Sequence, residues 1–386
     1  MISQIDVSLE IISLKDFLEK KTLFFSEINI NKVKTAWDFI SFLSKPKCTI
    51  HIIGTNGKGS TGRILAEYLL KKDYSVLHYT SPHILKFNER IWINGNDIDD
   101  STLEKAHQKL QKLLPQEHIE NLSYFEYTTL LALLLSNDMD FLVLEAGLGG
   151  EFDATNVIKN DLTILTTIDY DHQDFLGDTI EEITSTKVRS MDTAIIVAKQ
   201  IHDEVYDIAK NIALSKGLKY FRFDDFAGSK KSYDIFEQDF LNNNLLSVVA
   251  AIEYLKIPLD IEAFKGITIK GRCQKISPNI TVDVGHNPLG AYVIQKEFAD
   301  KKVFLVYNTL RDKDYKKVLF ILKPVIEHLY IIEIDDTRAL ERDKLENILN
   351  ELHISYSNFT HIPDDKEILV FGSFKVVEEF LKFYEK

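Results

Sequence analysis

The stretch that decides the fold is His51-Ile-Ile-Gly-Thr-Asn-Gly-Lys-Gly-Ser60. The apolar, β-prone run from Thr49 to Ile53 predicts a buried strand, and a helical pattern of apolar residues begins at about Ser60. A glycine-rich turn joins them. Glycines let backbone N–H groups point into such a turn, the helix N-terminus adds partial positive charge, and Lys58 adds a full charge. The stretch therefore predicts a phosphate-binding loop. The alternative is a structural strand-to-helix turn that contains a lysine.

Composition argues against several classes of protein. The 386 residues favour two domains over one. The net charge of −13 argues against a general nucleic-acid or membrane-surface binder, since either needs a basic face. Cys48 and Cys273 suit a reducing cytosol and lack zinc-site spacing. The N-terminus has no signal-peptide pattern, and the longest apolar run, Leu130–Leu135, is too short to span a bilayer. We expect a cytoplasmic protein without nucleic-acid or membrane partners.

Strands and helices alternate along most of the chain, which predicts parallel sheets covered by helices on both faces. The alternation breaks at 259–271, so we expect a first domain at 1–258, a linker at 259–271 and a smaller α/β domain at 272–386. Residues 1–45 are predicted to be helical and 218–240 irregular. Apolar runs predict strands at 49–53, 75–79, 90–93, 141–145, 161–168, 194–198, 280–284, 303–307, 329–333 and 368–371. Amphipathic stretches predict helices at 105–114, 127–135, 180–190, 244–255, 289–298, 315–322, 342–352 and 374–384.

Polar residues stand where several of these strands end. Ser81, Glu145, Asp171 and His172 each come at or just after the end of a predicted strand. Ligands of open α/β sheets bind beyond the carboxyl ends of the strands. Oxygen ligands and one imidazole beside a phosphate loop predict a Mg²⁺ site, because Mg²⁺ takes few protein groups and keeps waters and nucleotide oxygens. Taken singly, Glu145 could be a helix cap or ion-pair partner, and His172 an ordinary loop histidine.

Further candidates lie later in the chain. Lys187 falls on a predicted helix, where exposed lysines are common. Gly271-Arg272 and Asp283-Val-Gly-His-Asn-Pro288 begin the second domain. The latter stretch also suits a plain helix entry, with Asn287 as N-cap and Pro288 at the first helical position.

The order of these motifs resembles the folylpolyglutamate synthase/dihydrofolate synthase family of the Mur ligase superfamily. The similarity runs from about residue 45 to Phe374. Common phosphate loops have glycine at the position of Ile52 and no residue like Gly59 after the lysine, and both departures are this family's form. The motifs are Gly54-Thr-Asn-Gly-Lys-Gly-Ser60, Thr80-Ser-Pro-His83, Phe87-Asn-Glu-Arg90, Glu145-Ala-Gly-Leu-Gly-Gly150 with Asp153-Ala-Thr-Asn156, Asp171-His172 with Leu176-Gly177, and Asp283-Val-Gly-His-Asn-Pro288.

The resemblance implies a P-loop-containing, Mur-ligase-type central ATPase domain followed by a smaller Rossmann-like C-terminal domain. It implies an ATP-dependent ligase that activates the carboxylate of dihydropteroate or a reduced folate as an acyl phosphate, which the amine of L-glutamate then attacks. ATP is the implied co-substrate and Mg²⁺ the implied cofactor, at two sites. These small molecules are the expected partners, and we expect a monomer.

The chain departs from the family pattern at Phe240-Leu241, which replaces the family's His-Gln pair ahead of Asn244. The resemblance also assigns roles to individual residues. The implied catalytic residues are Lys58, Glu145, His172 and a carbamylated Lys187. The implied ATP-binding residues are Asn56, Gly57, Lys58, Gly59, Ser60, Asn244, Arg272 and Asp283. The implied metal ligands are Ser81 and Glu145 for one Mg²⁺ and His172 for the second. The implied pterin pocket consists of Ser123, Tyr124, Phe125, Glu126, Phe152, Asp153 and Ala154.

Two other functions stay open. A Mur ligase for peptidoglycan precursors would need an N-terminal UDP-binding domain, and only about fifty residues precede the phosphate loop. An ATPase without ligase activity would leave Arg272 and Asp283 unexplained. Whether a folate ligase acts on dihydropteroate, on reduced folates or on both depends on pocket geometry near 121–126 and 151–155.

Overall fold

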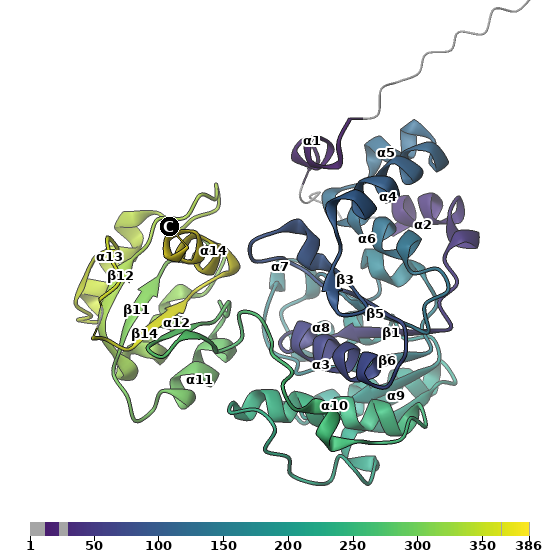
Figure 1. The fold of residues 1–386 in the computed structure, drawn as a ribbon. Coiled ribbons are helices and arrows are strands. Elements are labelled where there is room, and N and C mark those ends of the chain that lie inside the picture. The colour runs from purple at the N-terminus through teal and green to yellow at the C-terminus, as the bar shows by residue number, and fades with distance from the viewer. Residues whose placement is uncertain (1–11, 23–29, 364, 386) are drawn as a thin grey trace, which may run out of the picture.

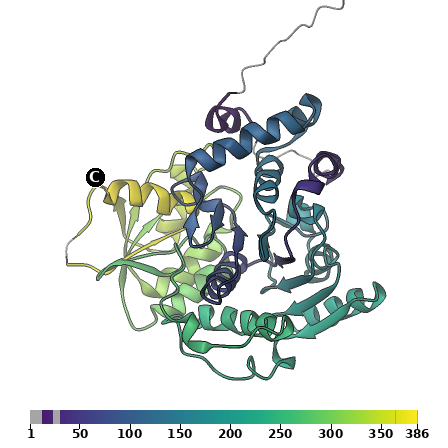
Figure 2. The ribbon, with the colours of Figure 1, turned by 45° about the vertical axis from the view of Figure 1, so that its right-hand side comes forward.

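The computed structural model describes residues 12–22, 30–363 and 365–385 (Figure 1). The described strands form two sheets flanked by helices, which confirms the predicted α/β class. The eight-stranded sheet has the order β4-β3-β2-β5-β1-β6-β7-β8, and the six-stranded sheet has the order β13-β12-β11-β14-β10-β9. Figures 1 and 2 show the smaller sheet, coloured green to yellow, beside the larger one.

The strands and helices have the following bounds. The strands are β1 (Cys48–Ile53), β2 (Val76–Tyr79), β3 (Ile91–Ile93), β4 (Asn96–Asp97), β5 (Phe141–Glu145), β6 (Leu162–Leu165), β7 (Ala194–Val197), β8 (Lys219–Arg222), β9 (Gln274–Ser277), β10 (Ile280–Val282), β11 (Val303–Tyr307), β12 (Ile326–Ile331), β13 (Tyr356–Asn358) and β14 (Ile368–Phe371). The helices are α1 (Leu14–Glu19), α2 (Ile30–Asp38), α3 (Lys58–Lys71), α4 (Asp100–Leu113), α5 (Gln116–Asn121), α6 (Tyr124–Leu135), α7 (Gln173–Leu176), α8 (Ile180–Val188), α9 (Glu204–Ser215), α10 (Asp239–Tyr254), α11 (Pro288–Glu297), α12 (Tyr315–Leu322), α13 (Arg342–Glu351) and α14 (Phe374–Tyr384).

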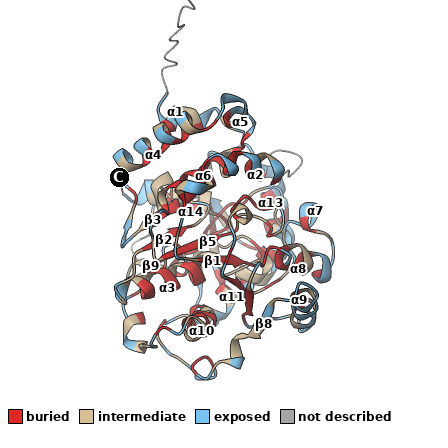
Figure 3. Cartoon of the chain, turned by 90° about the vertical axis from the view of Figure 1, so that its right-hand side faces the viewer, coloured by how far each residue is buried: buried red, intermediate tan, exposed pale blue. Residues whose placement is uncertain are grey.

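The central strands of the larger sheet are buried on both faces. From β2 to β8 its neighbouring strands pair in parallel, while β3 and β4 pair antiparallel at one edge. Successive residues of a strand point to opposite faces. Ile50, Ile52 and Val143 accordingly pack with α3 and α10, whereas Leu142 and Leu144 pack with α4 and α6. Figure 3 shows the buried strands between these helical layers. This two-sided burial explains why the strands of the sequence are nearly continuous apolar runs.

The smaller sheet repeats the arrangement. Its strands β10 to β13 pair in parallel, and β9 pairs antiparallel with β10 at the edge. The molecule thus has a first half built on the larger sheet and a second half built on the smaller sheet, and apolar side chains pack between them. Ile84, from the loop after β2, packs with Val282 and Val284 in a core of the smaller sheet, and Phe240 packs against core clusters of both halves. The boundary predicted at 259–271 lies between the two sheets and stays a prediction.

Several predicted elements were wrong in detail. The helix after the phosphate loop begins at Lys58 rather than at Ser60, and α4, α6 and α10 begin three to five residues before their predicted starts. Strand β8 lies in the segment predicted to be irregular, and β9, β13 and α9 were not predicted. Of the predicted N-terminal helical segment, α1 and α2 are present, while residues 1–11 and 23–29 lie outside the described residues. Within the described ranges, no helix combines the length and apolar character needed to cross a membrane.

Candidate active site

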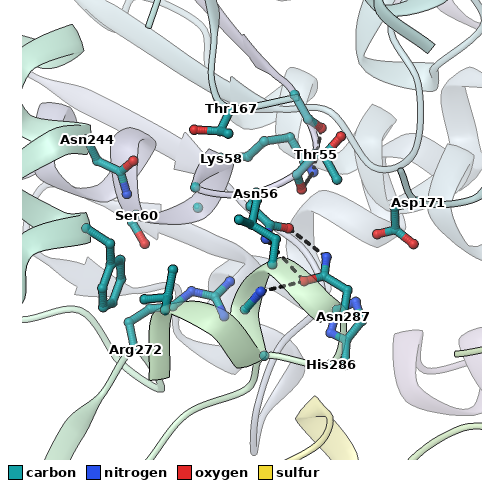
Figure 4. A pocket seen from close by; sticks show the side chains of 18 of the residues that line it. Thr55, Asn56, Lys58, Ser60, Thr167, Asp171, Asn244, Arg272, His286 and Asn287 are labelled. Atoms are coloured by element: carbon teal, nitrogen blue, oxygen red, sulfur yellow. Dashed lines mark hydrogen bonds between the residues drawn. The ribbon is translucent and has the colours of Figure 1, made fainter. Parts of the chain in front are cut away.

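The phosphate loop joins the end of β1 to the start of α3. Lys58 Nζ donates to Gly54 O and Thr55 O, at 3.1 and 3.2 Å, so the lysine folds back over its own loop. The N–H groups of Thr55 and Asn56 donate to Thr167 O, which ties the loop to the segment after β6. These hydrogen bonds fix the loop between β1 and α3, and Figure 4 shows Thr55, Asn56 and Lys58 together on it.

Glycine is required at two places in this loop. Gly54 has φ +141°, and a Cβ there would lie 2.0 Å from Thr166 Oγ1. Gly57 has φ +90°, and a Cβ there would lie 2.9 Å from Asn244 Oδ1. Both positions favour glycine because other residues rarely adopt positive φ. The second contact also places Asn244, from α10, directly against the loop, where the sequence predicted an ATP contact.

Glu145 ends β5 beside the same loop. Its side chain is buried, and Oε2 accepts from Thr80 Oγ1 and, at 3.2 Å, from the N–H of Ser81. A Cβ on Gly59 would lie 3.3 Å from Oε2, so the carboxylate faces the first turn of α3. Among the described residues, no lysine, arginine or histidine forms an ion pair with Glu145. A buried carboxylate without a cationic partner is costly, which favours a bound cation.

Lys187 lies on α8 with its side chain directed at the loop after β5. It is 2% exposed, and Nζ donates to Leu148 O at 2.9 Å. Burial, together with the nearby charge of Lys58, lowers the pKa of Lys187 to about 7. A large fraction of this amine is therefore neutral at pH 7, the form that reacts with carbon dioxide.

Asp171 and His172 meet a lysine from the second half of the molecule. Lys313, in the loop after β11, lies 3.3 Å from Asp171 Oδ1, and both side chains are largely buried. Burial acts to raise the pKa of Asp171, but His172 and Lys313 outweigh it and hold that pKa well below its usual range. Desolvation and Lys313 lower the pKa of His172 to about 4. The imidazole is therefore neutral near pH 7 and able to bind a metal.

A pair of amides forms a second bridge between the halves. Asn56 Nδ2 donates to Asn287 Oδ1 at 3.2 Å, and Asn287 Nδ2 donates to Asn56 Oδ1 at 2.8 Å (Figure 4). Asn287 Oδ1 also accepts from the N–H of Gly290 and so caps α11, with Pro288 at the first helical position. The plain helix entry considered from the sequence is thus present, and the same asparagine contacts the phosphate loop.

Arg272 and Asp283 line the site from the second half of the molecule. The guanidinium of Arg272 lies 5.6 Å from the ring centre of Phe374. Both oxygens of Asp283 accept backbone N–H groups, from Cys273 at 2.8 Å and from Gly285 at 2.7 Å. Asp283 thereby anchors the turn that carries Arg272.

These groups surround one cavity of about 370 Å³ between the two sheets. All the predicted catalytic, ATP-binding and metal-binding side chains line it, and so do residues that the sequence did not single out as site residues. The lining from the predicted set consists of Asn56, Gly57, Lys58, Gly59, Ser60, Ser81, Glu145, His172, Lys187, Asn244, Arg272 and Asp283. Lining residues without a predicted role in the site include Thr167 and Lys199, together with His286 and Asn287 of the Asp283-Val-Gly-His-Asn-Pro288 motif.

The seven residues predicted to form the pterin pocket are not among those that line this cavity. Ser123 and Glu126 form a capping box at the start of α6, and Phe125 stacks on Tyr79 at 6.0 Å. Phe152 is exposed, whereas Asp153 and Ala154 are buried. Tyr124 lies 5.2 Å below the guanidinium of Arg90. The pterin assignment stays a prediction.

The described residues fit a metal that takes few protein ligands. No three His, Cys, Asp or Glu side chains gather into a complete metal site in the part of the chain that the structure describes. Within the described ranges, Ser60 Oγ is buried at the cavity without a hydrogen-bond partner, and Glu145 has no cationic partner. Mg²⁺ completes its octahedron with waters and phosphate oxygens, so this donor set is compatible with it.

Comparisons with known proteins agree with this geometry. The sequence profile of the Mur ligase middle domain matches residues 52–244. The chain is 30% identical to a dihydrofolate synthase/folylpolyglutamate synthase of Haemophilus influenzae, over 94% of this chain and 95% of that protein. The crystal structure of Helicobacter pylori folylpolyglutamate synthetase is 39% identical, with a TM-score of 0.77 over 96% of this chain and 98% of that one. A bifunctional Yersinia pestis folylpolyglutamate synthase/dihydrofolate synthase, complexed with AMPPNP and a Mn ion, is 25% identical, with a TM-score of 0.84 over 96% and 97%.

Proposed function

Because this chain belongs to the dihydrofolate synthase/folylpolyglutamate synthase family of Mur-type ligases, we propose that it is an ATP-dependent ligase that joins L-glutamate to dihydropteroate or to a reduced folate. One observation carries the proposal beyond family membership. The cavity places a phosphate loop from one sheet opposite Arg272 and Asn287 from the other, so ATP bound at the loop would touch both halves.

The reaction has two steps. A carboxylate oxygen of the pterin substrate attacks the γ-phosphorus of ATP, the bond to the bridging β-phosphate oxygen breaks, and ADP leaves. The free amine of glutamate then attacks the acyl carbon, phosphate leaves, and the amine nitrogen gives up a proton to form the amide. In the first step two anions approach each other, so fixed cations are needed to stabilise the transition state. Lys58 and Arg272 supply such charge at the cavity.

We propose that Ser81 and Glu145 hold one Mg²⁺ and that His172 contributes to a second. Bound Mg²⁺ neutralises phosphate oxygens and acts as a Lewis acid during phosphoryl transfer. The Mn ion and AMPPNP in the Yersinia pestis complex support a divalent metal and an ATP-type nucleotide. The hydroxyl that common phosphate loops place directly after the lysine would come here from Ser81, at the end of β2. Calorimetric titration of Mg²⁺ with AMPPNP would count the sites.

We further propose that Lys187 is carbamylated. Its low pKa and near-complete burial support the modification, since only the neutral amine adds carbon dioxide. The carbamate would replace a buried cation by an anion beside the metal ligands, which removes repulsion of Mg²⁺. We also propose a cytoplasmic monomer, for which size-exclusion chromatography with light scattering is the test of the oligomeric state.

The decisive experiment is a product assay with ATP, Mg²⁺, dihydropteroate and L-glutamate. We expect ADP to accumulate only when both acceptors are present. ADP release that needs neither acceptor would instead indicate an ATPase without ligase activity. Mass spectrometry of the products, with dihydropteroate and a reduced folate offered separately, then distinguishes the two activities.

A further inference from the structure

A buried chain of hydrogen bonds leads from β1 to the loop after β5. His51, on β1, is 1% exposed, and its Nε2 lies 2.8 Å from Thr155 Oγ1. Thr155 Oγ1 lies 2.6 Å from Asp153 Oδ1, which also accepts from the N–H of Thr155 at 3.0 Å. The second oxygen of Asp153, Oδ2, accepts from the N–H of Leu148 at 2.9 Å. Both oxygens of this carboxylate are therefore engaged within the protein.

The direction of each hydrogen bond in this chain is fixed. An ionised carboxylate only accepts, so the Thr155 hydroxyl must donate to Asp153. The hydroxyl oxygen is then left to accept, so His51 must carry its proton on Nε2. His51 Nδ1 is consistent with this tautomer, because it is buried and no described residue forms a hydrogen bond with it. Burial also lowers the pKa of His51 to about 4, which keeps the imidazole neutral near pH 7.

The chain of hydrogen bonds ends at a group of the active site. Asp153 Oδ2 accepts from the N–H of Leu148, and the carbonyl oxygen of the same residue accepts from Lys187 Nζ at 2.9 Å. Leu148 itself lines the cavity. The far end of the loop is pressed on α8, since a Cβ on Gly150 would lie 2.2 Å from Lys187 O. Lys187 is thus in contact with this loop at both Leu148 and Gly150.

We propose that His51, Thr155 and Asp153 form a positioning relay that fixes Leu148 and, through it, the amine of Lys187 for the ligase reaction. None of the three is among the residues that line the cavity, so each acts through Leu148 rather than on a reactant. This inference rests on the proposed function. It also gives Asp153 a role other than the pterin contact expected from the family resemblance.

The test uses three threonine variants. Thr155→Val removes the hydroxyl, Thr155→Ser keeps it, and Thr184→Val is the matched control. Thr184 is a fully buried threonine on α8 whose hydroxyl has no hydrogen-bond partner among the described residues, so its replacement breaks none of the hydrogen bonds described. We expect Thr155→Val to lower kcat about 10- to 100-fold with the KM for ATP unchanged, the size of effect known for misplaced catalytic groups. Thr155→Ser and Thr184→Val should stay close to the wild type.

Amide hydrogen exchange provides a second readout that does not depend on activity. The peptide covering 146–153 should exchange faster in Thr155→Val and at the wild-type rate in the other two variants. Equal kinetics and exchange in the two valine variants would overturn the relay. So would a raised KM for the pterin substrate with unchanged kcat, because that result assigns Asp153 and Thr155 to substrate binding.

Failure of a variant to fold and failure of the proposed function can both be distinguished from failure of the relay. If Thr155→Val does not fold, His51→Leu compared with His51→Gln tests the same bond, because the glutamine amide can replace the Nε2 donor. If the wild-type protein forms no glutamyl product, the proposed function fails. The exchange comparison still reports on the relay in that case.

Discussion

Two lysines of the cavity have opposite surroundings. Lys58 donates to two carbonyl groups of its own loop and lines the cavity wall. Lys187 is enclosed, has one carbonyl acceptor and has a pKa of about 7. Lys58 is therefore suited to meet an anion, whereas Lys187 is suited to react as a neutral amine.

Replacing Lys58 by alanine should abolish turnover, because the charge on the transferred phosphate loses its partner. We expect kcat/KM to fall by at least about 100-fold, the scale of losing one stabilising group in a water-poor site. Steady-state kinetics with all three substrates measures the change. Lys71→Ala is the control, since Lys71 ends the same helix and its Nζ donates to Lys265 O at the surface.

Lys187→Ala should be inactive and partly rescued by a short carboxylic acid. Acetate can occupy the space of a carbamate and restore its negative charge near the metal ligands. The measurement is the rate of product formation as acetate is added. Lys58→Ala should show no rescue, and absence of rescue in Lys187→Ala at any acetate concentration would count against the carbamate.

The buried His51 should make stability depend on pH. Its pKa falls from 6.5 to about 4 on folding, so between these values the unfolded chain binds a proton that the folded chain does not. Lowering the pH from 7 to 4.5 therefore costs about 2 kcal/mol of unfolding free energy through this group. Between pH 7 and 4.5, the free energy of unfolding of His51→Gln should fall by about 2 kcal/mol less than that of the wild type. Urea unfolding at both pH values tests this, with the exposed His361→Gln as control.

At the scale of single elements, the turn between β1 and α3 depends on glycine geometry. Gly57→Ala introduces strain at φ +90° and a Cβ 2.9 Å from Asn244 Oδ1. We expect nucleotide affinity to fall about tenfold, together with a stability loss of about 1 kcal/mol. Gly217→Ala shares a positive φ, +68°, but its Cβ would meet nothing within 4 Å. Gly217→Ala is the control: it should lose a similar free energy of unfolding, and titration calorimetry should show that it binds AMPPNP as the wild type does.

Central and edge strands differed in how well they could be predicted. β1, β5 and β14 are buried on both faces and appear in the sequence as apolar runs. β8, β9 and β13 lie at or beside sheet edges, are only partly buried and contain Lys, Arg, Gln or Asn residues. Their pairing comes from the neighbouring strand rather than from their own apolar pattern. Helix starts were missed where polar residues precede the main apolar face, as in the first turn of α4 and at the asparagines 242–244 of α10.

The residues of the site also differ in how well they could be predicted from the sequence. Side chains at strand ends, such as Ser81 and Glu145, could be predicted because parallel strands end at one edge of a sheet. Lys313 also follows a predicted strand, so the same rule could have identified it. The contacts it makes could not be predicted from spacing, since Asp171 is 142 positions away in the chain. The bond between Asn56 and Asn287 spans 231 positions and depends on how the two halves meet.

At the scale of the whole molecule, residues that line the cavity stand on both sides of the connection between the sheets. We expect ATP and the pterin substrate to draw the halves together, because ATP bound at the phosphate loop would touch residues of both halves. Small-angle scattering with AMPPNP, Mg²⁺ and dihydropteroate should show a smaller radius of gyration than the free protein. Lys58→Ala should not respond, and unchanged wild-type curves would argue against a large closure.

The shared packing of Ile84 and Phe240 has a consequence for modularity. Ile84 belongs by sequence to the first half but completes a core of the second, and Phe240 contacts cores of both. A chain cut within 259–271 would leave Ile84 and Phe240 exposed on the first fragment, and would leave the cores of the second fragment without the side chains that pack on them. Neither fragment is self-sufficient, so the enzyme should tolerate division into two co-expressed pieces far better than the transfer of either piece to an unrelated partner.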